Sequence, residues 1–146
     1  CTQDVPKLYE IYKEPEITRY MEDLYENMDE EIKYTQDYIK WHYGLYGFGM
    51  WIVTDKAGRI IGRAGFDQKE EKEPHLGFMI RKDMQRQGLA FEVCSALMEY
   101  AASHFDVPGI ISLTHPQNTA SASLLKKLGF TCKEAEDTMV HWHRRL

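Results

Sequence analysis

The chain has 146 residues, 43% of them hydrophobic and 12% aromatic, which indicates one globular domain with its own core rather than a disordered or fibrous chain. No apolar run approaches the roughly 18 residues of a membrane span, so no membrane partner is expected. The net charge of −5 disfavours nucleic acid as a partner. The widely spaced cysteines predict neither a disulfide framework nor a zinc site and favour a cytoplasmic location. They are Cys1, Cys94 and Cys132.

Acidic residues concentrate between Glu14 and Asp37, where nine acids and two basic residues give a net charge of −7. By contrast, the segment 81–86 holds three basic residues and one acid. Two interpretations remain open. Either a cationic ligand binds at one place and an anionic ligand at another, or the segments are a solvated helical face and a basic turn.

In chain order, the pattern first predicts a helix capped by Asp4 and stopped by Pro15. A second helix is predicted from Asn27, which begins a capping-box pattern with Glu30, to Gly44. A glycine- and aromatic-rich loop and the two strands of a hairpin are expected next, at 44–49, 51–54 and 59–66.

The second half alternates strands and helices. The charged segment 67–73 is expected to be an exposed loop before a strand at 75–80. A long amphipathic helix is predicted from about Gly88 to Phe105. The remaining elements are a strand at 110–114, a helix at 119–128 and two paired strands at 130–134 and 138–144. The prediction is therefore a single α/β (α+β) domain over residues 1–146.

The most informative segment joins the strand at 75–80 to the long helix and reads Gln85-Arg-Gln-Gly88-Leu-Ala90. A glycine at such a turn lets the backbone approach a ligand closely, and the free N–H groups of the first helical turn then point at that ligand. The segment predicts a phosphate-binding loop. It lacks both the Gly-Lys-Ser/Thr of nucleotide hydrolases and the glycine pattern of dinucleotide folds.

This loop resembles the Q/R-x-x-G-x-G/A pyrophosphate loop of the GNAT superfamily, the acetyl-CoA-dependent N-acetyltransferases. The strand 75–80 is similar to the family's fourth strand, and the long helix follows in the right order. Asn118-x-x-Ser121, followed by Lys127-x-Gly129-Phe130, resembles the signature of the branch that contains ribosomal-protein alanine N-acetyltransferases. The resemblance covers nearly the whole chain.

The resemblance implies a single GNAT-like domain. Its sheet would be mixed, mostly antiparallel and six- to seven-stranded, split between its fourth and fifth strands and flanked by about four helices. The pantetheine arm of acetyl-CoA would insert into the split. The family has a strand before its first helix, whereas only Cys1 to Gln3 precede Asp4 here. We therefore expect the first strand to be missing from this chain.

The resemblance also implies acetyl-CoA as co-substrate, with no metal. The backbone of Phe78, Met79 and Ile80 would pair with the pantetheine amides like an added strand. Asn118 and Ser121 would contact the pantetheine or phosphate region, and a helix N-cap is a further role for Asn118. The pyrophosphate would be held by backbone amides of Arg86, Gln87, Gly88, Leu89, Ala90 and Phe91.

Acetyl transfer requires a group that accepts the amine's proton and an N–H that polarises the thioester carbonyl. The N–H of Met79 or Ile80 is expected to do the latter. His75, where many family members carry glutamate, and His115 are the candidate catalytic bases. An exposed residue after Pro74 and a loop-ordering residue are their respective structural alternatives.

Some relatives use a tyrosine as general acid, at a position that is Leu125 in this chain. A leucine has no proton to donate, so water or another tyrosine would protonate the thiolate. The available tyrosines are Tyr34, Tyr38, Tyr43 and Tyr46.

The predicted function is transfer of an acetyl group from acetyl-CoA to a primary amine, on a small molecule or a peptide or protein N-terminus, by direct attack in a ternary complex. The alternative is a catalytically silent CoA-binding sensor or structural module. The acidic segment predicts a cationic acceptor, and a homodimer is left open. His141 and His143 share a strand face but lack a third ligand, so no metal site is predicted.

Overall fold

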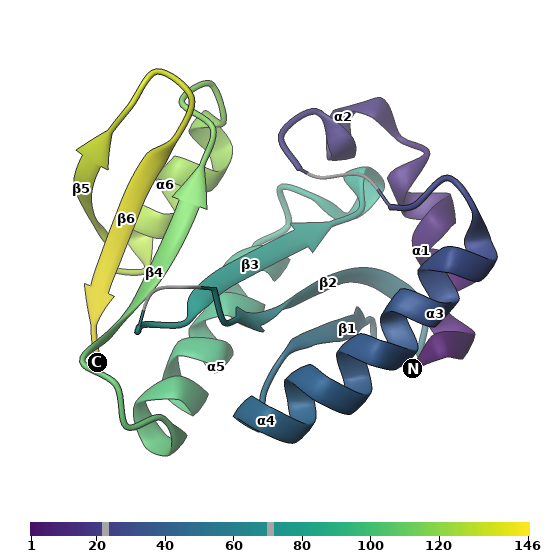
Figure 1. Ribbon diagram of the computed structural model, residues 1–146. Coiled ribbons are helices and arrows are strands. Elements are labelled where there is room, and N and C mark those ends of the chain that lie inside the picture. The colour runs from purple at the N-terminus through teal and green to yellow at the C-terminus, as the bar shows by residue number, and fades with distance from the viewer. Residues whose placement is uncertain (22–23, 70–71) are drawn as a thin grey trace.

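Six strands form one mixed sheet in a computed structural model that describes residues 1–21, 24–69 and 72–146 (Figure 1). The strand order is β1-β2-β3-β4-β6-β5, and every neighbouring pair except β3–β4 is antiparallel. The strands are β1 (Met50–Thr54), β2 (Ile60–Asp67), β3 (His75–Ile80), β4 (Gly109–Thr114), β5 (Thr131–Ala135) and β6 (Val140–Arg145). The expected sheet and single α/β domain are confirmed.

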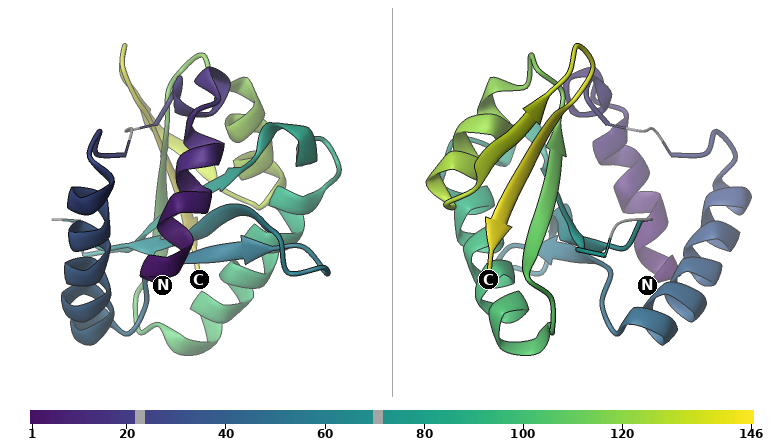
Figure 2. Two further views of the ribbon diagram at one scale, coloured as in Figure 1. Left: turned by 90° about the vertical axis from the view of Figure 1, so that its right-hand side faces the viewer. Right: turned by 60° about the vertical axis from the view of Figure 1, so that its left-hand side comes forward.

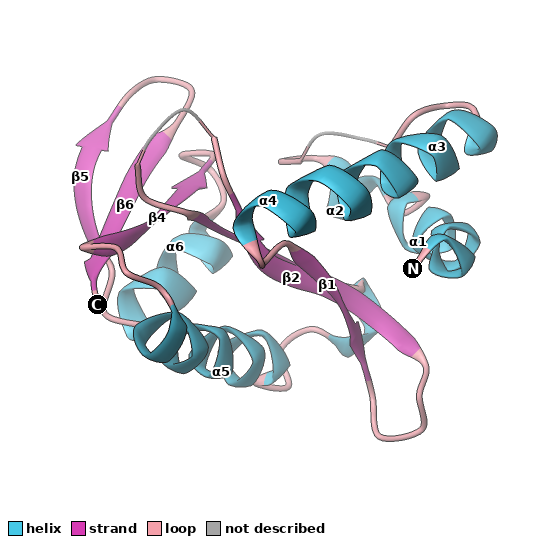
Figure 3. Ribbon diagram, turned by 60° about the horizontal axis from the view of Figure 1, so that its bottom comes forward, coloured by secondary structure: helices cyan, strands magenta, loops and turns pink. Residues whose placement is uncertain are grey.

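Helices cover both faces of this sheet (Figure 3). The helices α1 (Val5–Tyr12) and α3 (Met28–Tyr38) lie on one face, and α5 (Leu89–His104) and α6 (Thr119–Lys127) lie on the other (Figures 2 and 3). Shorter segments are η1 (Thr2–Asp4), α2 (Pro15–Thr18), the π-helical turn η2 (Ile39–Tyr43), α4 (Gly44–Tyr46) and η3 (Lys82–Met84).

Two helix ends differ from the sequence prediction. Gly44 was expected to stop the second helix, but it keeps a helical φ of −65° and the helix continues through α4. The stop is Gly47, whose φ of +74° is the left-handed conformation that glycine adopts without strain. Asn27 caps α3 as expected, since its Oδ1 accepts a hydrogen bond from the Asp29 N–H at 2.8 Å. Asp4 makes no side-chain cap on α1.

Two apolar clusters hold the layers together. The larger lies between the sheet and α5 and α6, and it includes Phe66, Ile110 and Leu125, none of which exposes any surface. Cys94 is buried in the same cluster, and burial raises the pKa of its thiol to about 12. Cys94 is therefore a packing residue and not a nucleophile. The smaller cluster packs α1 against the other face.

The strand β1 forms one edge of the sheet, and the first strand of the family was expected to be missing from this chain. Within the described part of the chain, no strand precedes α1, and β1 pairs on one side only, with β2. No helix among the described residues has the length and apolar character needed to cross a membrane.

Candidate active site

The sheet opens between β3 and β4, as Figure 1 shows. Their ladder consists of a single pair, His75 with Ile111. Two hydrogen bonds accompany it: the Ile111 N–H donates to the Pro74 carbonyl at 3.0 Å, and the Ser112 hydroxyl donates to the Leu76 carbonyl at 2.9 Å. Beyond this junction the strands diverge, which leaves the inner edge of β3 without a partner strand.

The register of β3 on β2 decides which backbone groups face this split. The Arg81 N–H donates to the Ile61 carbonyl on β2 at 2.8 Å, and hydrogen-bonded pairs alternate along an antiparallel ladder. The backbone of Met79 therefore points to Arg63 on β2, whereas that of Phe78 and Ile80 points into the split. The sequence predicted that the N–H of Met79 or of Ile80 polarises the carbonyl, and only the N–H of Ile80 faces the split. The N–H of Phe78, which was not predicted for this role, faces the split as well.

The loop after β3 presents a run of free amides at the start of α5. The first hydrogen bond of α5 runs from the Glu92 N–H to the Gly88 carbonyl at 3.0 Å. The amides from Arg86 to Phe91 donate to no protein group in the part of the chain that the structure describes. Arg86 and Gly88 both have left-handed backbones, with φ of +61° and +82°. Alternating backbone conformations of this kind form anion-binding concavities, so the loop has the geometry of a phosphate site.

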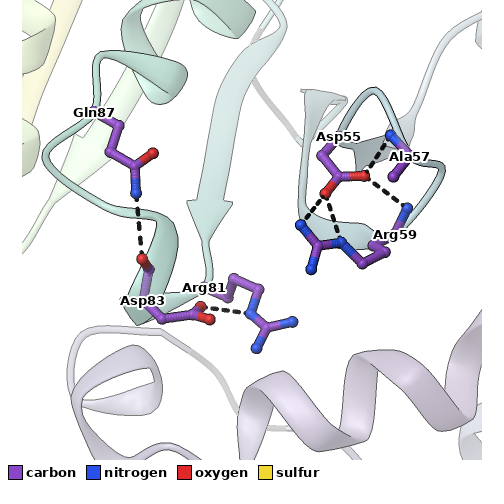
Figure 4. Close-up of polar contacts among 6 residues, drawn as sticks. All are labelled: Asp55, Ala57, Arg59, Arg81, Asp83 and Gln87. Atoms are coloured by element: carbon purple, nitrogen blue, oxygen red, sulfur yellow. Dashed lines mark hydrogen bonds and ion pairs between the residues drawn. The ribbon is translucent and has the colours of Figure 1, made fainter.

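Side-chain contacts hold this loop in place and leave Arg86 without an ion pair among the described residues. Arg81 pairs with Asp83 at 2.6 Å, and the Gln87 side chain donates to the Asp83 carbonyl at 3.3 Å (Figure 4). Lys82 pairs with Glu16 on α2. Arg86 has no ion pair among the described residues, so it is the basic residue of this loop that is available to a phosphate.

Two predicted site residues make local contacts beyond β4. The Asn118 Oδ1 accepts the Ser121 N–H at 3.1 Å, so Asn118 is the N-cap of α6. His115 stacks on Tyr20 with ring centroids 5.0 Å apart, and its Nδ1 accepts the Gln117 N–H at 3.1 Å. These contacts order the loop around His115, and its role as a base stays a prediction.

His75 lies on the helix-α1 face of the sheet, at the closed end of the split. It is 5% exposed, so the alternative of an exposed residue after Pro74 is wrong. Its cross-strand partner on β2 is Asp67, which therefore shares this face. The structure thus brings the candidate base to the side of the sheet that is opposite to α5.

A cavity of about 550 Å³ opens on this same face, between the sheet, α1 and α3. Its acidic wall includes Glu31, which is 5% exposed and accepts the Tyr25 N–H at 3.1 Å. One basic residue, Arg63, also lines it. The acids and tyrosines of the lining are Asp4, Glu31, Asp67, Tyr25, Tyr34, Tyr38 and Tyr43. Glu22 and Asp23 of the acidic segment lie outside the described residues.

Three tyrosines of this cavity, Tyr34, Tyr38 and Tyr43, are neutral phenols because their pKa values are raised. Burial and the nearby Asp67 raise the pKa of Tyr34, and Arg63 opposes that shift. Burial is also the main cause that raises the pKa of Tyr38 and of Tyr43. The Tyr43 hydroxyl donates to the Met50 carbonyl at 2.9 Å, and the Met50 N–H donates to the Tyr38 oxygen at 3.2 Å. Protonated phenols can supply a proton to a leaving group but do not accept one.

Comparison with known proteins assigns the family. A family model described as the acetyltransferase (GNAT) domain matches residues 1–131. The chain belongs to the GNAT acetyltransferase family. It is accordingly of the acetyl-CoA-dependent N-acetyltransferase class.

Named relatives are distant in sequence and close in fold. An uncharacterized N-acetyltransferase, YoaA of Bacillus subtilis, is 27% identical over 132 residues, which are 88% of this chain and 74% of that protein. RimL, a ribosomal L7/L12 α-N-protein acetyltransferase solved with coenzyme A, has a TM-score of 0.84 at 19% identity and covers 100% of this chain and 90% of its own. A spermidine N-acetyltransferase chimera of Vibrio cholerae SpeG and hSSAT has a TM-score of 0.81 at 16% identity, with coverage of 99% and 91%.

Two residues considered in the sequence analysis, Leu125 for the general-acid position and His143 for a metal site, have structural roles in this GNAT chain. Leu125, at the position of the tyrosine acid of some relatives, lies in the larger apolar cluster. The Nε2 of His143 pairs with the Glu73 carboxylate at 2.8 Å. The described residues include no group of three or more histidine, cysteine or acidic side chains placed to hold a metal ion.

Arg63 is a charged residue of the cavity that the sequence analysis missed. The signal was present, because Arg63 is the one charged residue between Ile60 and Phe66, in a strand that is otherwise apolar or glycine. A charge in a strand buried on both faces points to a ligand or to an ion pair.

Proposed function

We propose that the protein transfers the acetyl group of acetyl-CoA to a primary amine by direct attack in a ternary complex. The observation that carries this proposal is that two sites lie on the neighbouring strands β2 and β3. The free amides that follow β3 suit the pyrophosphate. The backbone of Phe78 and the N–H of Ile80 face the split and suit the pantetheine amides, whereas the Ile80 carbonyl accepts a hydrogen bond from the Gln85 side chain at 2.8 Å. The acidic cavity lies over β1 and β2, on the face of the sheet that also carries His75.

The chain's own residues then have separate roles in the reaction. His75 would take the proton of the ammonium, directly or through water, so that the amine nitrogen attacks the thioester carbonyl carbon. The N–H of Phe78 or Ile80 would stabilise the negative charge that develops on the carbonyl oxygen. As the C–S bond breaks and the carbonyl forms again, the nitrogen releases its second proton and the thiolate gains one, through water or through the phenol of Tyr34, Tyr38 or Tyr43, which is then reprotonated.

We further propose that the acceptor is cationic, such as a polyamine, a basic peptide or an aminated sugar. The cavity's carboxylates outnumber its one arginine, and its tyrosine rings favour an ammonium group through cation–π contacts. Fold relatives named for a ribosomal protein and for spermidine accept amines of both kinds, large and small.

The test is release of free coenzyme A thiol from acetyl-CoA when a panel of amines and peptides is added. Thiol release that depends on the amine, with a product heavier by one acetyl group, supports the proposal. Acetyl-CoA binding by calorimetry without thiol release, for every amine in the panel, would instead support the silent sensor or structural module.

A further inference from the structure

Arg63 lies at the centre of β2, and none of the described residues is a hydrogen-bond or ion-pair partner of its side chain. Its cross-strand neighbours are Ile52 on β1 and Met79 on β3. Its guanidinium carbon lies 5.3 Å from the centre of the Tyr12 ring. Its Nε is buried without a hydrogen bond, and no ion pair or hydrogen bond joins the guanidinium to any other described residue.

Such a placement is unfavourable unless another group completes it. The buried Nε loses its hydration, and the Tyr12 ring restores only part of that loss. A guanidinium has five N–H donors in a planar fork, which fits the paired oxygens of a carboxylate or the oxygen of a carbonyl group. The ligand group that suits Arg63 is therefore an oxygen acceptor.

The cavity that Arg63 lines offers both signs of charge. Glu31 stands on α3, on the opposite wall from β2, and Asp67 lies four residues along β2 from Arg63 on the same face. The phenol of Tyr34 senses both carboxylates and Arg63, because the carboxylates raise its pKa and the guanidinium lowers it. These charged groups thus surround one space, which suits a molecule with an ammonium group and an oxygen close together.

The register places this oxygen site beside the reacting atoms. Arg63 is paired with Met79, and the residues on either side of Met79 carry the N–H groups that face the split. Neighbouring strands lie about 4.8 Å apart. In an aminoacyl group the nitrogen and the carbonyl oxygen are separated by three bonds of about 1.2 to 1.5 Å each. An amine directed at the split from β2 therefore brings an oxygen of that kind to the guanidinium.

We propose that Arg63 is a specificity-determining residue that binds the carbonyl or carboxylate oxygen of an acceptor whose amine is on the adjacent carbon. This inference rests on the proposed function and narrows the cationic acceptors proposed above to those that carry an aminoacyl group, such as a basic peptide. Plain alkylamines and polyamines lack the oxygen and are poorer acceptors.

The test compares L-alaninamide with isopropylamine, which has a similar branched carbon chain but no oxygen. We expect Arg63→Met to lower kcat/KM for alaninamide about ten- to hundredfold, the effect of losing a hydrogen bond to a charged group. For isopropylamine we expect a change of less than about twofold. Arg63→Lys keeps the charge without the fork and is expected to retain part of the preference. Arg59→Met is the matched control, because Arg59 is exposed in the β1–β2 hairpin and pairs with Asp55 at 2.7 Å.

A second readout does not require turnover. Binding of each amine to the coenzyme A complex is measured by calorimetry for the wild type and for both Arg63 variants, after circular dichroism has shown that they fold. Loss of alaninamide binding in Arg63→Met supports the inference even if no amine releases thiol, a result that would contradict only the proposed function. Equal losses for both amines, or no loss for either, would overturn the role of Arg63. Adding L-alanine distinguishes a carboxylate ligand from a carbonyl ligand.

Discussion

Gly88 combines two properties that separate ligand binding from folding. Its φ of +82° suits glycine, and a Cβ at this position would meet no protein atom within 4 Å. We expect Gly88→Asp to abolish acetyl-CoA binding while the protein stays folded, because a carboxylate would lie among the amides proposed to hold the pyrophosphate. Calorimetry with acetyl-CoA measures the affinity.

The matched control is Gly58→Asp. Gly58 has a φ of +78° and equally open surroundings, but it lies in the turn between β1 and β2. It therefore carries the same backbone strain without the nearby amides. Wild-type affinity in Gly88→Asp, or an equal loss in both variants, would contradict the phosphate-binding role of the loop.

His75 is the residue on which the proposed chemistry depends most. We expect His75→Ala to lower turnover about a hundredfold or more at neutral pH, with little change in acetyl-CoA affinity, because a general base typically contributes that much. Because His75 is buried, His75→Gln serves as a second variant that fills more of the space. Unchanged turnover in both variants would point to His115 or to deprotonation of the amine in bulk water.

At the scale of single residues, sequence reasoning succeeded where one local motif decides the outcome. Gly88 and the cap at Asn118 could be predicted because their backbone roles follow from neighbours in the chain. The cavity could not be predicted, because Glu31 and Arg63 come to line the same cavity only after α3 packs on the sheet. A solvated helical face and the wall of a cavity show the same charge pattern in sequence.

At the scale of elements, every predicted strand was found because the apolar segments are short and bounded by turn residues. The end of the second helix was not predicted correctly. Gly44 and Gly47 can each end a helix, and the outcome depends on which of them takes a positive φ. The segment 67–73 was expected to be an exposed loop, and its residues 70 and 71 lie outside the described residues. Of the rest, Asp67 ends β2, and Glu73 forms an ion pair with His143 on β6. A contact between residues 70 positions apart in the sequence cannot be predicted from local sequence patterns.

The closed end of the split has little room, which gives a prediction about stability. A Cβ on Gly109 would lie 2.6 Å from the His143 Nε2, 2.7 Å from the Arg144 carbonyl oxygen and 2.8 Å from the Glu73 Oε1. We expect Gly109→Ala to lower the free energy of unfolding by about 1 to 3 kcal/mol, because the pair must move to accept a methyl group. Urea denaturation measures this change.

Gly44→Ala is the comparison for this measurement. Gly44 has a helical φ of −65° and no atom within 4 Å of a Cβ, so alanine there is expected to raise the free energy of unfolding by about 0.4 to 1 kcal/mol. If Gly109→Ala were as stable as the wild type, the contact between Glu73 and His143 would not hold the two sides of the split together.

At the scale of the whole molecule, the charge distribution predicts a salt effect. The acidic cavity should concentrate cations, and screening shortens that effect from about 10 Å at 0.1 M salt to about 3 Å at 1 M. We expect the KM for the acceptor to rise several-fold from low to high salt. We expect Glu31→Gln to flatten the rise, because it removes a buried carboxylate of the cavity. A KM that is independent of salt, or a preference for neutral or acidic amines, would contradict a cationic acceptor.

The divergence of β3 from β4 has a consequence for amide hydrogen exchange. In most sheets a central strand exchanges slowly along its whole length, since both of its edges are paired. In β3, the Met79 amide is paired to β2, whereas the amides of Phe78 and Ile80 open into the split. In the free protein, the amide protons along β3 should therefore alternate between fast and slow exchange with solvent. Acetyl-CoA should slow the fast set and leave Met79 unchanged.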